Sequence, residues 1–135
     1  MLKFIVGLKG AGKTKEIVAQ ANTAVKETNG CVAFIEKGTK LIHELDKKIR
    51  LADTEEYGVA NACSLYGMVV GMYASNHDIT HIFIDSALKI IDNDVEALAA
   101  LADKLNAFSE KNNVTVVATN SINKEDLPAS AQKYV

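Results

Sequence analysis

Two kinds of apolar pattern alternate along this chain. Short continuous apolar runs, which are typical of strands covered on both faces, occur over residues 3–6, 31–35, 48–52, 79–85 and 114–119. Apolar residues at helical spacing occupy residues 15–28, 57–74 and 95–111, and shorter helices are predicted at about 40–46 and from residue 128. Strands that alternate with helices predict a parallel sheet joined by right-handed crossovers.

Capping and turn-forming residues set the expected limits of these elements. Asn29-Gly30 follows the first long helix, and Asp92-Asn93-Asp94 precedes the last one. Gly67 and Gly71 are four residues apart and predict a thin helix that packs tightly against the sheet. We therefore expect one α/β domain over residues 1–135, in three layers, with a mostly parallel sheet of four or five strands and helices on both faces.

The turn between the first strand and the first helix has the spacing of a phosphate-binding loop. Residues 7–14, Gly-Leu-Lys-Gly-Ala-Gly-Lys-Thr, match the Walker A pattern at every required position. Glycines leave backbone N–H groups free to surround a polyphosphate, and the following helix adds its unpaired first-turn N–H groups. The predicted phosphate-binding residues are Gly7, Gly10, Ala11, Gly12, Lys13 and Thr14. Lys13 would reach the β- and γ-phosphates, and the Thr14 hydroxyl would bind Mg²⁺.

Three other predicted strands end in polar residues at the same edge of the sheet. They are Glu36, Asp85 and the pair Asn120-Ser121. Ligands of parallel sheets bind beyond the carboxyl ends of the strands, so all three ends are candidates for one site. Asp85 terminates an apolar run and is the predicted Mg²⁺ ligand opposite Thr14.

The same strand ends supply candidates for catalysis. Asn120 and Ser121 are neutral polar groups suited to the γ-phosphate or to an attacking water, although turns and caps use the same residue types. Ser86 stands where a glutamate often follows the metal aspartate, so Glu36 becomes the candidate general base. The predicted catalytic residues are therefore Glu36 and Ser121.

These residues together resemble the RecA-like ATPase core. The similarity rests on the loop 7–14, the run 31–36, Asp85-Ser86 after an apolar strand, and the Asn120-Ser121 strand end. The chain is also similar to small bacterial phosphate-loop proteins of unknown role that are sometimes labelled twitching-motility PilT-like. The resemblance implies a P-loop NTPase fold, with the last core strand between the loop strand and the metal-aspartate strand. It also implies ATP hydrolysis, usually at subunit interfaces, so a second copy or a protein partner is expected.

The sequence also departs from that family. Gly38 occupies the position of the RecA glutamate, and Ser121 replaces the glutamine that ends the sensor strand. Arg50 is the only arginine, whereas arginine usually stabilises phosphoryl-transfer charge. We therefore expect binding of Mg²⁺ and ATP with weak or partner-dependent hydrolysis. The alternative is a module that senses nucleotide without turnover, and a small-molecule kinase is a third interpretation.

A second short motif leaves two nucleotide bases, adenine and guanine, as candidates. Residues 123–126, Asn-Lys-Glu-Asp, fit the guanine-reading spacing Asn-Lys-x-Asp, in which Asp126 would accept from the exocyclic amine of guanine. The motif falls three residues after Asn120 rather than directly at a strand end. ATP is preferred by resemblance, and GTP is the alternative.

Charge and hydropathy narrow the expected partners. The chain of 135 residues has a net charge of −2 at pH 7, and its only lysine cluster along the sequence is Lys47-Lys48, so we expect no nucleic-acid partner. The longest apolar run, residues 65–74, contains glycines and is too short to span a bilayer. No signal peptide is visible before the loop. We expect a cytoplasmic protein whose ligand is a nucleoside triphosphate.

Overall fold

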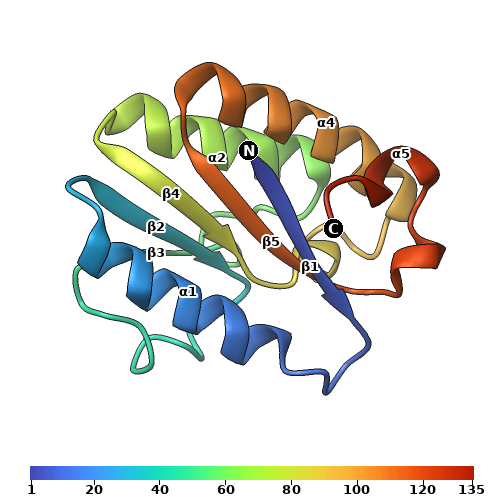
Figure 1. Cartoon of the computed structure of the whole chain (residues 1–135), viewed down its shortest axis with the longest axis horizontal. Coiled ribbons are helices and arrows are strands. Elements are labelled where there is room, and N and C mark those ends of the chain that lie inside the picture. Colours follow the sequence, from blue (N-terminus) through green and yellow to red (C-terminus); the bar gives the residue numbers. More distant parts are fainter.

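A single five-stranded sheet organises the fold in the computed structural model, which describes residues 1–135 (Figure 1). The strands are β1 (Leu2–Gly7), β2 (Cys31–Glu36), β3 (Arg50–Asp53), β4 (Ile79–Ile84) and β5 (Thr115–Ser121). Their order is β1-β5-β4-β2-β3, and all four neighbouring pairs are parallel. The parallel sheet is confirmed, and β5 lies between β1 and β4 as expected.

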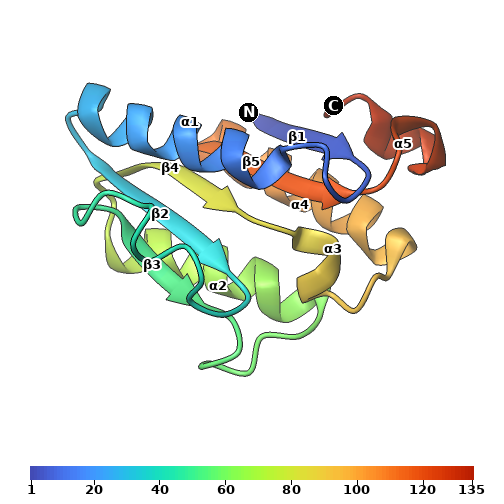
Figure 2. The same ribbon diagram turned by 90° about the horizontal axis from the view of Figure 1, so that it is seen from below.

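Helices cover both faces of this sheet and complete three layers (Figures 1 and 2). α1 (Lys13–Glu27) packs on one face, and α2 (Ala62–Ser75) and α4 (Val95–Asn112) pack on the other. Each face has its own apolar core, with 11 buried residues on the α1 side and 26 on the α2 and α4 side. Burial on both faces explains why the central strands are continuous apolar runs.

Three short elements lie after the carboxyl ends of β4 and β5. They are α3 (Ala87–Ile90), the 3₁₀ turn η1 (Lys124–Asp126) and α5 (Ala129–Gln132). The last segment closes the outer edge of β1, because Phe4 N donates to Tyr134 O at 2.7 Å and the Tyr134 hydroxyl donates to Asp103 Oδ1 at 2.7 Å. No helix combines the length and apolar character needed to cross a bilayer.

The helix predicted at residues 40–46 is wrong, because this segment forms consecutive turns. Leu41 and Leu45 are buried four residues apart, which imitates a helical pattern. The Asn22 side chain on α1 determines the actual path. Its Nδ2 donates to Glu44 O at 3.0 Å, and its Oδ1 accepts from Asp46 N at 2.8 Å. Glu44 O and Asp46 N therefore bond to this side chain rather than to backbone partners within a helix.

The second long helix begins later than predicted, at Ala62 rather than near Tyr57. Asn61 and Ser64 form a capping box, in which Asn61 Oδ1 accepts from Ser64 N at 2.8 Å and Ser64 Oγ accepts from Asn61 N at 3.2 Å. The tight packing predicted for Gly67 and Gly71 is also wrong. Both glycines are exposed, and a Cβ at either position would meet no atom within 4 Å.

Candidate functional site

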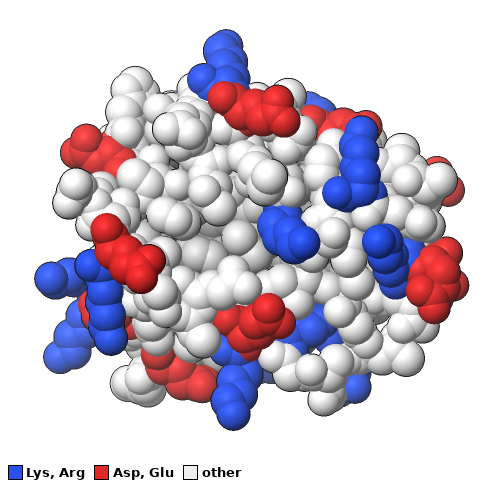
Figure 3. All heavy atoms as spheres, viewed as in Figure 1, with Lys and Arg blue, Asp and Glu red and all other residues white.

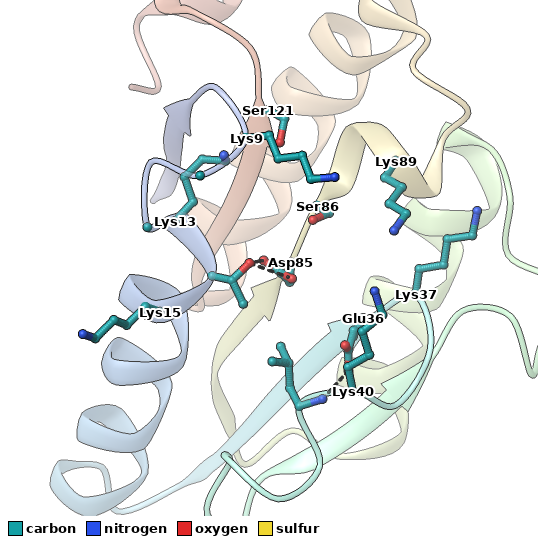
Figure 4. A pocket seen from close by; sticks show the side chains of 14 residues that line it. Lys9, Lys13, Lys15, Glu36, Lys37, Lys40, Asp85, Ser86, Lys89 and Ser121 are labelled. Atoms are coloured by element: carbon teal, nitrogen blue, oxygen red, sulfur yellow. Dashed lines mark hydrogen bonds between the residues drawn. The ribbon is translucent and has the colours of Figure 1, made fainter.

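A polar cavity of about 610 Å³ opens beyond the carboxyl ends of the strands (Figure 4). Fourteen residues line it, and Leu41 is the only hydrophobic one. Its walls come from the glycine-rich loop (residues 7–14), Glu36 at the end of β2, Asp85 after β4 and Ser121 at the end of β5. The four strand ends that the sequence nominated therefore meet in one cavity.

The glycine-rich loop folds back tightly between β1 and α1. Ala11 N donates to Leu8 O at 3.1 Å, which closes a turn inside the loop. A Cβ at Gly7 would lie 3.0 Å from Ala11 Cβ, so a side chain there would push the turn open. Gly12 has φ +87°, a left-handed conformation that favours glycine. The glycines are therefore required by the path of the loop.

The first turn of α1 has no side-chain cap, although other long helices in this chain do. Gly12 is its N-cap residue and offers no side-chain acceptor. By contrast, the first turn of α4 is capped by Asp94, whose Oδ1 accepts from Ala97 N at 3.0 Å. Unpaired N–H groups at a helix start, together with the positive end of the helix dipole, favour an anion. The amino end of α1 lies at the cavity, with Gly12, Lys13 and Thr14 in the lining.

Thr14 and Asp85 meet across the cavity floor. Thr14 Oγ1 donates toward both carboxylate oxygens of Asp85, at 3.2 and 3.4 Å. Asp85 is only 7% exposed, and its Oδ1 also accepts from Thr119 Oγ1 at 2.8 Å. Thr119 Oγ1 in turn accepts from Ser86 N at 2.7 Å. This network fixes the carboxylate beside the first turn of α1.

The Thr14–Asp85 pair brings together a hydroxyl and a carboxylate, which are hard oxygen donors. Mg²⁺ takes hard oxygen ligands and is usually held by one or two carboxylates together with substrate phosphates. A hydroxyl and one carboxylate meet that requirement only when a phosphate ligand supplies further oxygens. No group of three or more His, Cys, Asp or Glu residues could hold a metal ion elsewhere in the chain. The donor set therefore fits a magnesium ion that arrives with a polyphosphate.

Glu36 is a buried carboxyl group at the cavity wall. It is 5% exposed, and its Oε1 accepts from Leu41 N at 3.4 Å. Burial raises the pKa of Glu36 above its ordinary value of 4.5, and the negative charges of Asp85 and Asp53 add to the rise. The Leu41 hydrogen bond and the Lys40 charge oppose it. A carboxyl group with a raised pKa is better able to take up a proton.

Lysines dominate the charge of the cavity. The lining contains Lys9, Lys13, Lys15, Lys37, Lys40 and Lys89, against the two carboxyl groups of Glu36 and Asp85. Lys13 Nζ donates to Leu8 O at 3.1 Å, so its ammonium is folded back onto the loop. In Figure 4, Lys15 points away from the cavity and Lys9 extends across it. Such an excess of positive charge suits a polyanionic ligand.

Several predicted residues lie outside the lining. Gly7 and Ala11 are absent from the lining, and Gly7 N donates to Ile122 O at 3.1 Å. Asn120 is fully buried, and its Oδ1 accepts from Leu88 N at 3.0 Å, so it anchors α3. Residues 123–126 are also absent from the lining.

The sequence reasoning missed most of the cavity lysines. Lys37 and Lys40 come one and four residues after the end of β2, and Lys89 comes four residues after Asp85. The rule that nominated Glu36 and Asp85 also applies to the residues just beyond them, because the loops after parallel strands share one edge of the sheet. That signal was present in the sequence.

No protein-family model matches this sequence, and no match is found among curated proteins.

Proposed function

We propose that this protein binds a nucleoside triphosphate together with Mg²⁺, with ATP as the favoured nucleotide and GTP as the alternative. The observation that carries the proposal is the meeting of Thr14, at the uncapped start of α1, with the buried carboxylate of Asp85 in a lysine-lined cavity. Backbone N–H groups and Lys13 would hold the phosphates. Thr14 and Asp85 would hold the metal ion, which supplies charge neutralisation of the phosphates when bound.

The cavity also supports weak or partner-dependent hydrolysis. Glu36 is the one buried carboxyl group of the lining besides Asp85, and its raised pKa suits a group that accepts a proton from water. Ser121 is exposed at the end of β5 and would orient the water or the γ-phosphate. An acceptor and a positioning hydroxyl are thus available without a partner.

A second candidate function is nucleotide sensing without turnover. The observation that favours it is the absence of arginine from the cavity, because Arg50 lines a separate hollow beside β3 and α2. Phosphoryl-transfer charge would then be stabilised only by lysine or by a residue from a partner chain. Binding at Thr14 and Asp85 would still report nucleotide occupancy through β4 and α3.

Phosphate release separates the two functions. Purified protein is incubated with Mg²⁺ and ATP at low and high protein concentration, beside a Glu36→Gln variant and an Asp46→Asn control outside the cavity. Hydrolysis predicts release by the wild type and the control, and loss of release in Glu36→Gln. Equal background release by all three proteins, with nucleotide still bound, would assign the site to sensing.

A further inference from the structure

Three lysines form a wall that the phosphate loop does not explain. Lys37 and Lys40 lie on the segment between β2 and β3, and Lys89 lies on α3. All three line the cavity, and Figure 4 shows them across from the glycine-rich loop. Among the lysines of the cavity, only Lys13 makes a side-chain hydrogen bond. The ammonium groups of this wall are therefore available to a ligand.

We infer that Lys37, Lys40 and Lys89 form a second anion subsite, which binds the phosphate group of a phosphomonoester beside the magnesium-bound triphosphate. The inference rests on the proposed function, because it assigns the triphosphate to the loop. It adds a second ligand of stated chemistry to the same cavity. We call these three residues the lysine wall.

The backbone that carries the lysine wall is anchored on both sides. Gly38 N donates to Asp53 Oδ1 at 2.7 Å, which ties the start of the β2–β3 segment to β3. Leu41 N donates to Glu36, which ties the next turn of that segment to β2. A subsite whose frame is fixed before binding loses less entropy when the ligand arrives.

The α3 side of the wall is anchored to β5. Ser86 N donates to Thr119 Oγ1 at 2.7 Å, and Leu88 N donates to Asn120 Oδ1 at 3.0 Å. Leu88 is buried, whereas the next residue, Lys89, is exposed at the cavity. Only the lysine side chain is then free to move toward a ligand.

The charge of the cavity exceeds what one nucleotide balances. Five lysines face two carboxyl groups in the cavity, because Lys15 points away from it. A divalent cation adds further positive charge, and the triphosphate that comes with it does not cancel the remainder. A phosphomonoester brings about −1.5 to −2 charges at neutral pH, which suits that surplus. A neutral second ligand would leave the lysines of the wall mutually repelling.

The lining also argues against other classes of ligand. It holds no aromatic side chain, and Leu41 is its only hydrophobic residue, so a second ligand with a large apolar body would find no matching surface. On the molecular face in Figure 3, acidic and basic side chains are interspersed rather than gathered by sign. The net charge of the chain is −2. An extended nucleic-acid backbone finds no basic track on this face, whereas a small phosphate fits within the cavity.

Calorimetry with two ligands tests the inference. The protein is first saturated with Mg²⁺ and a non-hydrolysable ATP analogue, and inorganic phosphate is then titrated as the probe. The test variant replaces Lys37, Lys40 and Lys89 with Gln. The control replaces Lys26, Lys47 and Lys124 with Gln, which removes the same charge from exposed positions outside the cavity. We expect wild type and control to bind phosphate, and the wall variant to bind it at least tenfold more weakly with unchanged affinity for the analogue.

The outcomes separate this inference from the proposed function. Failure of the analogue to bind any of the proteins overturns the proposed function, and the subsite with it. Analogue binding with no phosphate binding to the wild type overturns the subsite alone. Equal phosphate binding by the wall variant also overturns it. Weaker analogue binding by the wall variant would place the lysine wall on the triphosphate itself and overturn a second ligand. Displacement of phosphate by a single-stranded oligonucleotide, but not by glycerol phosphate, would overturn the small-ligand assignment.

Discussion

Replacement of Asp85 by asparagine separates metal binding from folding. The Asp85 carboxylate is 7% exposed and accepts from Thr119 Oγ1 at 2.8 Å and from Thr14 Oγ1 at 3.2 Å. An asparagine Oδ1 can keep the Thr119 hydrogen bond, so the free energy of unfolding should fall by only about 1 kcal/mol. The carboxylate charge that Asp85 would offer to the proposed metal ion is lost completely. A charge-assisted contact contributes about 1.5–3 kcal/mol. Its loss corresponds to a dissociation constant for ATP with Mg²⁺ that is about ten- to hundredfold larger.

Calorimetric titration of ATP with and without Mg²⁺ measures this effect. We expect Asp85→Asn to weaken binding only when Mg²⁺ is present, because without the metal the lost charge merely removes repulsion of the phosphates. Asp126→Asn is the matched control, since Asp126 is exposed on η1 and absent from the cavity. Unchanged affinity in Mg²⁺, or an equal loss with and without Mg²⁺, would refute the assignment of Asp85 as a metal ligand.

Two further predictions concern stability. The pKa of Glu36 is raised above 4.5 by burial, so its ionised form destabilises the fold. The wild type should therefore lose stability relative to Glu36→Gln as the pH rises from below 4.5 through the folded-state pKa. Urea unfolding across this range should show the free energy of unfolding of the wild type falling relative to that of the variant. A difference in free energy that stays constant with pH would contradict the burial effect. Gly67→Ala should raise the free energy of unfolding by about 0.5–1 kcal/mol, because Gly67 lies exposed inside α2 and the new Cβ meets no atom. A loss of stability in thermal unfolding would show that this surface of α2 is not open.

The alternation of strands and helices was predictable because strands buried on both faces must be apolar throughout. Five strands were placed within about two residues of their observed limits, and Asp94 was correctly expected at the start of α4. The helix at residues 40–46 was not excluded by the sequence, since the buried Leu41 and Leu45 keep helical spacing. The deciding contact is the Asn22 side chain, which is 22 residues from Glu44 in sequence. Local patterns carry no information about such a partner.

The part of the candidate site that lies at strand ends was predictable, because ligands of parallel sheets bind beyond the carboxyl ends of the strands. The convergence of Glu36, Asp85 and Ser121 at the glycine-rich loop follows from parallel strands and an intact motif. Lys37, Lys40 and Lys89 were missed because they lie one to five residues beyond the strand ends, so the rule predicts them only when it is extended to the loops that follow the strands. The burial of Asn120 was also missed, since its role depends on α3, a helix of four residues that periodicity cannot detect.

Nucleotide-dependent thermal stability tests the central claim most directly. The proteins compared are the wild type, Lys13→Ala and the control Lys26→Ala, which lies on the same helix outside the cavity. A ligand at 100 times its dissociation constant adds about 2.7 kcal/mol to folded-state stability, which for this chain length is roughly 10 °C in melting temperature. We predict that shift with Mg²⁺ and ATP for the wild type and the control, and little or none for Lys13→Ala. No shift with any magnesium nucleotide, or an equal shift in all three proteins, would contradict the account.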